Sequence, residues 1–378
     1  MSSSSTNSGK RNRYQNTSPA GVDQTRSQLQ SLTPSEGVRL YLADRKQDLR
    51  RSSWKTHESV LGFFERWCEE NEIEDLNDLT GRDLHRFRVW RREEAPSKTD
   101  TLSIHTEQTS QKILRQYLRY CVRIEAVPVG LPEKVQIPVV PEDERAKSEA
   151  IDPEEAREII DWLETYEYAS LAHTTWVILA DTGARISSVV ALDLDDYRAN
   201  EDPPHLRVRD REGTHLKNGQ RGERLIALRA STCDVIDDYL AHHRHDVLDA
   251  DNREALLTTS HGRVSKSTVR KNVYRWTRPC VRGQSCPHGR DPEDCEPARK
   301  AASSSRCPSS KSPHTVRRGY ITHALNAGVD QALIGEKCDV TPEILEAHYD
   351  ARNQREKLEV RKQAFELARR DHQSYGGR

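Results

Sequence analysis

The sequence lacks the features that mark membrane, secreted and uniformly basic proteins. No apolar run approaches the length of a membrane span and no signal peptide is visible at the N-terminus, so a cytoplasmic protein is expected. The 59 Lys and Arg balance the 60 Asp and Glu to a net charge of −1, which argues against a uniformly basic nucleic-acid-binding protein. Any surface that binds nucleic acid would therefore be a local basic patch. Phe and Met are scarce, but hydrophobic residues make up 34% of the chain, enough for packed cores.

The first 125 residues predict a disordered tail followed by a small helical domain. Residues 1–30 are rich in Ser, Thr, Asn and Gln and are too polar to build a core. Thr33-Pro34-Ser35-Glu36 then has the form of a capping box with proline at the first helical position. Further helices are predicted after Ser53, after Thr80 and over about 104–124. Their inward-facing residues are expected to be Val60, Leu61, Phe64, Trp67, Leu84, Phe87, Trp90, Ile113, Leu114, Leu118 and Val122.

A proline-rich segment separates this domain, 31–125, from a second one. Residues 126–150 contain four prolines among mixed charges, which indicates an extended interdomain linker. The next helix start is Asp152-Pro153-Glu154-Glu155, and the second domain is expected over 151–370, with a short tail after it. At 378 residues, the chain is long enough for two such domains.

The second domain is predicted to be mainly helical with a small antiparallel sheet, so the whole chain is expected to be mainly α with some β structure (α+β). Alternating apolar residues over 205–228 predict short strands, and Asn218-Gly219 predicts a tight hairpin turn between them. Helices are predicted from about 152 to 192 and over 232–245, 267–277, 313–327 and 352–370.

Charged residues are expected mainly on exposed faces. The acidic run Asp193 to Asp196 has the composition of a solvated surface. Seven arginines of the helical domain are also expected on its surface, where they could contact a nucleic-acid backbone or simply solvate the helices: Arg86, Arg88, Arg91, Arg92, Arg115, Arg119 and Arg123.

Half of the eight cysteines gather in one Gly-, Pro- and Ser-rich insert, 280–307. Cysteines clustered in a reducing compartment indicate a metal site more than disulfides. Cys280, Cys286, Cys295 and Cys307 could bind one structural zinc ion tetrahedrally, with His288 close by. Their separations are looser than in a common zinc knuckle, so a flexible, metal-free loop is the alternative.

The second domain also carries residues that together could attack a phosphodiester without a metal. Thr182-Gly183-Ala184-Arg185-Ile186-Ser187 holds one arginine, and His314-Thr315-Val316-Arg317 holds a histidine and another arginine. Tyr349 lies 32 residues beyond Arg317. Arginine forks match phosphate oxygens and keep their charge. A tyrosine hydroxyl becomes a covalent nucleophile once a base takes its proton.

In this order and spacing, the motifs resemble those of the tyrosine recombinases, also called phage-type integrases. The specific motifs lie between about 150 and 350, while the domain layout is similar over both domains. The resemblance implies a helical core-type DNA-binding domain over 31–125 and a catalytic domain over 151–370. It also implies that Lys217, beside the predicted turn, is the hairpin lysine of the family.

The resemblance implies a role for each of these residues. Tyr349 is expected to attack a DNA phosphorus, expel a 5′-hydroxyl and form a 3′-phosphotyrosine, which a second 5′-hydroxyl then resolves. Arg185 and Arg317 are expected to neutralise the transition state. His314 is the candidate base or hydrogen-bond donor, and Lys217 is the candidate acid. The reaction requires no metal or nucleotide cofactor. The expected partner is double-stranded DNA, bound by a homo-oligomer (a tetramer) in which the C-terminal helix docks on a neighbour.

The sequence departs from the family pattern at three places. Ser188 stands where an acidic residue is usual, and Arg318 stands where a histidine is common. The second His or Trp that normally precedes the nucleophile is missing from Ile334-Gly335-Glu336-Lys337-Cys338-Asp339. Lys337 could fill that place, and Cys338 is the alternative.

Two other functions are compatible with this sequence. A type IB topoisomerase-like enzyme would nick and close DNA with the same chemistry, and a non-catalytic DNA-binding regulator could use the cysteine insert as a zinc module. The intact set of Arg, His, Arg and Tyr argues against the regulator. The compact helical domain and the C-terminal helix favour a recombinase.

Overall fold

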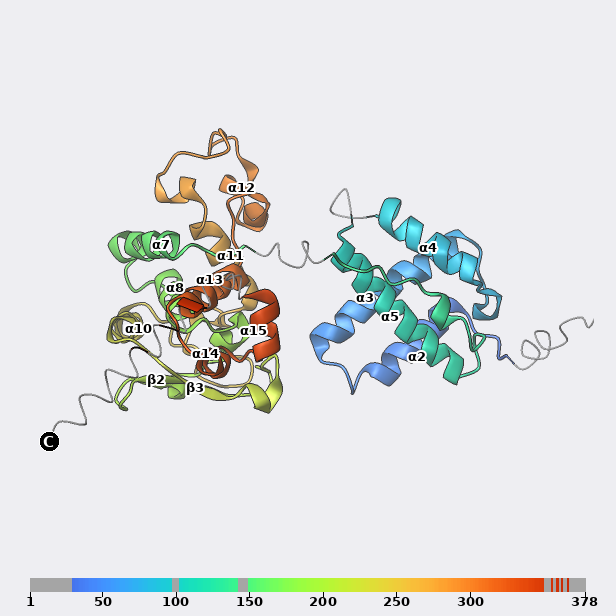
Figure 1. The fold of residues 1–378 in the computed structure, drawn as a ribbon, viewed down its shortest axis with the longest axis horizontal. Coiled ribbons are helices and arrows are strands. Elements are labelled where there is room, and N and C mark those ends of the chain that lie inside the picture. Colours follow the sequence, from blue (N-terminus) through green and yellow to red (C-terminus); the bar gives the residue numbers. More distant parts are fainter. Residues whose placement is uncertain are drawn as a thin grey trace, which may run out of the picture. The chain divides into compact units, whose positions relative to one another are not determined.

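The computed structural model describes residues 29–96, 102–141 and 149–349, with isolated positions at 355, 358, 359, 362 and 366. The chain divides into two compact units, Met1–Glu144 and Arg145–Arg378 (Figure 1). Nearly all of the predicted N-terminal tail, the C-terminal tail and most of the helix predicted over 352–370 lie outside the described residues. No helix within these described ranges is long and apolar enough to cross a membrane.

The first unit is helical. It contains α2 (Pro34–Arg45), α3 (Arg51–Glu70), α4 (Gly81–Glu93) and α5 (Ile104–Arg123), with short 3₁₀ helices η1 (Leu76–Asp78) and η2 (Pro132–Lys134). Thr33 accepts a hydrogen bond from the backbone N–H of Glu36, and Thr80 forms a reciprocal capping box with Asp83. Most of the predicted inward residues are buried in one core, including Leu61, Phe64, Trp67, Leu84, Phe87 and Leu114.

The segment after α5 belongs to this core, so the prediction of a linker from residue 126 is wrong. Four of its apolar residues are at most 2% exposed and pack in the first unit: Ala126, Val127, Leu131 and Val135. Arg115 donates a hydrogen bond to the Val135 carbonyl, and Gln108 donates to the Pro138 carbonyl at 3.0 Å. The prolines interrupt regular structure, but the apolar side chains between them still pack. Composition alone therefore placed the end of the domain too early.

Some of the arginines predicted on the surface of this unit are bound within it. Arg88 donates to Glu107 at 2.5 Å and to Gln136 at 2.8 Å. Arg119 pairs with Glu133 at 3.1 Å. These contacts tie the segment that follows α5 to α4 and α5, although Arg119 stays 61% exposed.

The second unit is built around the buried helix α8 (Leu171–Thr182), which packs against α7 (Pro153–Tyr166), α10 (Ala230–His242), α11 (Lys266–Trp276) and α13 (Pro313–Asn326). The structure also describes α9 (Ile186–Val190), α14 (Gln331–Cys338) and α15 (Pro342–His348) in this unit. A three-stranded antiparallel sheet runs in the order β1 (Tyr197–Arg198), β2 (His205–Val208), β3 (Arg224–Ala227), and β4 (Thr258–Thr259) pairs with β5 (Gly262–Arg263). The predicted fold class, mainly α with a small antiparallel sheet, is confirmed.

The connection between β2 and β3 is longer than predicted. Val208 pairs with Arg224, so 209–223 forms an extended connection and the tight hairpin turn predicted at Asn218-Gly219 is wrong. Asn218 instead precedes a 3₁₀ helix, η4 (Gly219–Gly222), where Gly219 adopts a φ of 60°. The Asn-Gly pair therefore marks a turn inside the connection.

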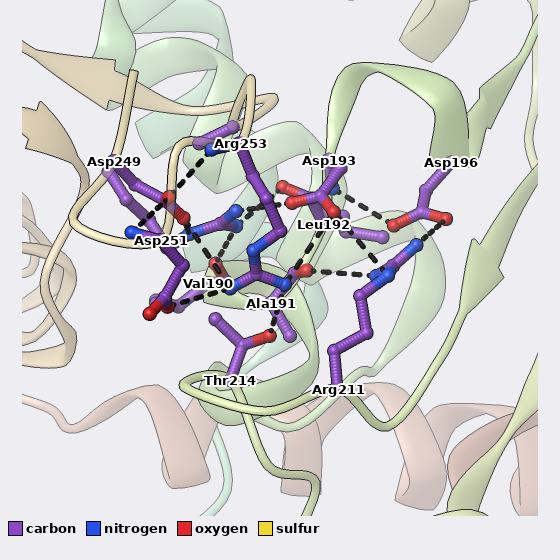
Figure 2. Close-up of polar contacts among 12 residues, drawn as sticks. Val190, Ala191, Leu192, Asp193, Asp196, Arg211, Thr214, Asp249, Asp251 and Arg253 are labelled. Atoms are coloured by element: carbon purple, nitrogen blue, oxygen red, sulfur yellow. Dashed lines mark hydrogen bonds and ion pairs between the residues drawn. The ribbon is translucent and has the colours of Figure 1, made fainter.

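The prediction of a solvated surface is wrong for Asp193 and Asp196, which belong to a buried ion-pair network (Figure 2), while Asp195 of the same run is exposed. Asp196 is 0% exposed and pairs with Arg211 at 2.6 Å. Asp193 is 9% exposed and pairs with Arg263 and, at 3.7 Å, with Arg253. The partners come from segments downstream of the acidic run, so the composition of the run itself could not reveal its burial.

The same network fixes the end of α9. Arg263 donates hydrogen bonds of 2.9 Å to the carbonyls of Val190 and Leu192, and it pairs with Asp249 at 2.7 Å. α9 is short and begins directly after Arg185, the first predicted catalytic arginine. The contacts of Arg263 therefore fix the position of the helix that follows Arg185.

Candidate active site

The first predicted arginine lies at the corner between α8 and α9. Gly183 ends α8 with a φ of 59°, and Arg185 is the N-cap of α9. A Cβ on Gly183 would lie 2.4 Å from the ring of Tyr320, so the close approach of α13 requires glycine here. The Arg185 guanidinium donates a hydrogen bond to the carboxylate of Asp339. Burial lowers the pKa of Arg185, and the charge of Arg317 lowers it further.

Arg317 comes from the buried face of α13 and is 2% exposed. Ser312 caps α13 by accepting a hydrogen bond from the Thr315 N–H, and this sets the first turn that carries His314. Arg317 Nη1 donates to the Gly183 carbonyl at 2.9 Å. Its Nε and Nη2 have no hydrogen-bond partner among the residues that the structure describes. Buried donors of a charged group are costly to leave unbonded, and an incoming oxyanion would satisfy them.

Tyr349 follows α15 and is 6% exposed. Its ring centroid lies 6.4 Å from that of His314, with the two planes inclined at 67°. The guanidinium carbon of Arg318 lies 5.2 Å from the centroid of the same tyrosine ring. The structure therefore places the predicted nucleophile beside the predicted base and close to a cation.

Lys217, the remaining predicted residue, acts electrostatically on His314. Burial lowers the pKa of His314, and the charges of Arg318, Arg317, Lys217 and Arg185 lower it further. A neutral imidazole can accept a proton at neutral pH. Lys217, from the connection between β2 and β3, also lines with Arg185 an open groove of about 920 Å³. All five main predicted residues therefore converge: Arg185, Lys217, His314, Arg317 and Tyr349.

Comparison with known proteins gives matches among solved structures. No protein-family model and no curated protein sequence matches this chain. A structure of the Tn1549 transposon integrase in complex with a circular intermediate DNA is 14% identical, has a TM-score of 0.63, and covers 88% of this chain and 99% of that chain. A lambda integrase dimer bound to a COC′ core site is 12% identical, with a TM-score of 0.59 and coverage of 88% of this chain and 81% of that chain.

This chain has the tyrosine-recombinase fold. Both structures cover most of this chain, and the resemblance first drawn from the motifs is thus confirmed for the fold. A third structure, the N-terminal domain of a phage integrase/site-specific recombinase from Haloarcula marismortui, is 35% identical over 29% of this chain and 99% of that chain, with a TM-score of 0.27.

Two residues of the recombinase fold that sequence reasoning missed also join the site. Asp339 follows α14 with a φ of 53°, and it accepts hydrogen bonds from Arg185 and, at 2.8 Å, from Asn218. Arg224 on β3 donates to the Lys337 carbonyl at 2.8 Å, and burial lowers its pKa to about 10. Asp339 is the last residue of the turn, 334–339, in which the second His or Trp was sought. Nothing in the sequence distinguished Arg224 from other arginines in strands.

The two candidates for the second His or Trp position of the recombinase motif differ in their surroundings. Lys337 lines the groove that Arg185 and Lys217 also line. Lys337 Nζ donates to the Asp181 carbonyl at 3.2 Å and lies 5.2 Å from the Tyr320 ring centroid. Cys338 is 0% exposed and its thiol faces the Thr182 carbonyl at 3.8 Å. The structure thus directs both side chains toward the end of α8, and the side chain that reaches Arg185 from this turn belongs to Asp339.

The four cysteines of the insert also come together, at some distance in sequence from these motifs. Cys280, Cys286, Cys295 and Cys307 all line one small cavity of about 10 Å³, together with His288. All four are free thiols. As the side chains stand, no group of three or more His, Cys, Asp or Glu in the described part of the chain is arranged to hold a metal ion.

Proposed function

We propose that this protein is a site-specific DNA recombinase that cleaves and rejoins DNA through a 3′-phosphotyrosine bond. The observation that carries the proposal is the buried guanidinium of Arg317, with two donors left without a partner among the described residues, next to Arg185 and the pair His314 and Tyr349. This arrangement would suit the charged oxygens of a phosphodiester next to a covalent nucleophile. The DNA named in the Tn1549 and lambda integrase structures supports DNA as the substrate class.

Each proposed step follows from the position of one side chain. The Tyr349 oxygen attacks the phosphorus, and its proton passes to neutral His314. The bond from phosphorus to the 5′-oxygen breaks, and Lys217 gives that oxygen a proton. Arg185 and Arg317 bind the equatorial oxygens, whose negative charge grows in the transition state. Attack by a 5′-hydroxyl of another strand reverses these transfers and releases the tyrosine.

The protein groups supply both the charge and the protons for this sequence of steps. Two guanidinium groups neutralise the phosphoryl oxygens, while a histidine and a lysine move the protons. We therefore propose catalysis without a metal or nucleotide cofactor, on double-stranded DNA, by an oligomer of this chain that forms on the DNA as a tetramer. Sedimentation of the protein with and without a bound DNA site tests the assembly.

One experiment distinguishes this function from the two alternatives. Double-stranded sites are first selected for binding from a random-sequence library, and the protein is then incubated with pairs of such sites and, separately, with supercoiled plasmid. A recombinase exchanges strands between two DNA molecules, whereas a type IB topoisomerase-like enzyme relaxes the plasmid and exchanges nothing. Binding without cleavage in either assay would contradict the proposal and favour a regulator.

A further inference from the structure

The cysteine insert has almost no apolar core of its own. It consists of η5 (Pro279–Arg282), α12 (Glu296–Arg299) and η6 (Ala301–Arg306), and in Figure 1 it lies at the opposite end of the unit from β2 and β3. Between residues 283 and 302, Pro297 alone is buried, and the next buried residues are the serines Ser303 and Ser304. Hydrophobic burial therefore cannot account for the order of this segment.

The four thiols are the groups that could hold this segment together in place of apolar side chains. The four cysteines are half-buried and line the same cavity, whose volume of about 10 Å³ is close to that of one water-sized sphere. The four cysteines are thus gathered around one small space.

A buried arginine beside the thiols is the second, independent observation. Arg278 is 3% exposed, and its guanidinium donates to the Pro297 carbonyl, which carries no net charge. Among the described residues, no carboxylate forms an ion pair with Arg278. Arg278 lines the same cavity as the four cysteines. A buried cation is costly without a counter-charge, and neutral thiols would provide none.

We propose that Cys280, Cys286, Cys295 and Cys307 bind one zinc ion in a closed structural site. Four thiolates around one Zn²⁺ carry a net negative charge, which would balance Arg278. Binding requires the four side chains to move toward one another, since the thiols are not yet arranged as ligands. The cavity suits a single ion better than an iron–sulfur cluster, which brings several iron and sulfide atoms. With all four positions filled by sulfur, the ion has no open site for a catalytic water.

The site would hold the start of the helix that carries His314. Just after Cys307, Ser310 Oγ donates to the carbonyls of Ser304 at 2.5 Å and of Tyr274 at 3.1 Å. The backbone N–H of Lys311 donates to Thr277 Oγ1 at 2.9 Å. These bonds join the end of the insert to the end of α11, directly before the cap of α13. Zinc would thus act on cleavage indirectly, by fixing the position of α13.

Elemental analysis of the purified full-length chain tests the proposal without DNA and therefore independently of the proposed function. About one zinc per chain is expected, and Cys286→Ser should lose it. Cys233→Ser changes a thiol of α10 outside the insert and is the matched control, which should keep its zinc. His288→Ala should also keep it, because His288 Nε2 bonds Ser309 Oγ at 2.8 Å and is not a ligand in a four-cysteine site.

A measurement on the unchanged protein covers the case in which Cys286→Ser fails to fold. Mercurial reagents that modify thiols should release about one zinc per chain, detected with a chromophoric chelator, and protease should then cut within 283–307. Cobalt-loaded protein should show the thiolate-to-cobalt absorption of a tetrahedral sulfur site. Zinc-free, iron-free protein with a protease-resistant insert would overturn the proposal, as would zinc retained in Cys286→Ser or several iron atoms per chain.

Discussion

The carboxylate of Asp339 accepts a hydrogen bond from the guanidinium of Arg185, 154 positions earlier in the sequence. The same carboxylate accepts a 2.8 Å hydrogen bond from Asn218 Nδ2. One side chain thereby connects the corner between α8 and α9, the connection that carries Lys217, and the end of α14. Arg185 keeps its orientation because Asp339 holds it, while its other donors can face a phosphate.

Asp339→Asn is expected to lower the rate of strand cleavage about tenfold, or about 1.4 kcal/mol in barrier height. The amide can still bond Asn218, but it loses the charge that orients Arg185. Affinity for DNA should not fall, since the substitution removes a negative charge from a phosphate site. Asp234→Asn, the same change at an exposed position of α10, is the control and should cleave normally. If Asp339→Asn cleaves at the wild-type rate in a single turnover, Asp339 does not orient Arg185 for cleavage.

Lysine should not replace either arginine of the site. We expect Arg317→Lys and Arg185→Lys each to lose about a hundredfold in cleavage rate, or about 3 kcal/mol, because a point charge cannot reproduce a bidentate fork. DNA binding should change much less than the rate. Arg270→Lys, at an exposed position of α11, serves as the matched control. If the two site variants cleave as fast as the control, the transition-state role is wrong.

The pH dependence of cleavage should report His314. Its pKa is lowered below the usual 6.5, first by burial and then by the neighbouring cations, so the neutral, proton-accepting form persists below pH 6.5. Cleavage should therefore fall on acidification with a midpoint below pH 6.5. His314→Asn should be slow and should lack this acidic limb. A midpoint at or above pH 6.5, or an unchanged limb in His314→Asn, would contradict the assignment of the base.

Protonation of His314 should also lower the free energy of unfolding as the pH falls. The unfolded chain binds this proton near pH 6.5, while the folded chain binds it only at lower pH, so the free energy of unfolding falls as the pH drops through that window. Burial lowers the pKa of His173 to about 4. Its protonation therefore lowers the free energy of unfolding further, down to about pH 4. Rate measurements should therefore stay above pH 5, where His173 is still neutral.

The elements that were predicted correctly are those with local causes. The caps at Thr33 and Thr80 act within one helical turn, and the spacing of apolar residues on each helix follows from its period. The motif residues also depended on local signals, such as the left-handed Gly183 before Arg185. Such patterns can be read without knowing what packs against them.

The features that were missed depend on contacts between distant segments. Burial of Asp196 requires Arg211, and the packing of 126–141 requires arginines and apolar residues of α4 and α5. Asn218-Gly219 has the composition of a hairpin turn, but the pairing of β2 and β3 decides where the strands end. Arg224 enters the site only because β3 lies next to α14.

The buried network provides a prediction about stability. Asp193→Asn should lower the free energy of unfolding of the second unit by about 2 kcal/mol, because it removes one of the two carboxylates that Arg263 and Arg253 share. The other carboxylate, that of Asp249, still pairs with both arginines. Asp195→Asn, at the exposed position in the same run, should change it by no more than about 0.5 kcal/mol. Denaturant unfolding of both variants measures the difference, and equal effects would show that the network is not stabilising.

The most direct test of the central claim is to trap the covalent bond at Tyr349. The protein is incubated with selected DNA sites in which a nick, moved stepwise along the site, lets the 5′-hydroxyl fragment diffuse away after cleavage. Mass spectrometry of the digested adduct should find DNA joined through a 3′-phosphate to Tyr349. Tyr320→Phe removes the hydroxyl of a tyrosine packed against the same core cluster as Tyr349, and it should form the same adduct. Tyr349→Phe should bind the DNA and form none. An adduct on Tyr349→Phe, or cleavage by the wild-type protein with no covalent bond to Tyr349, would contradict the account.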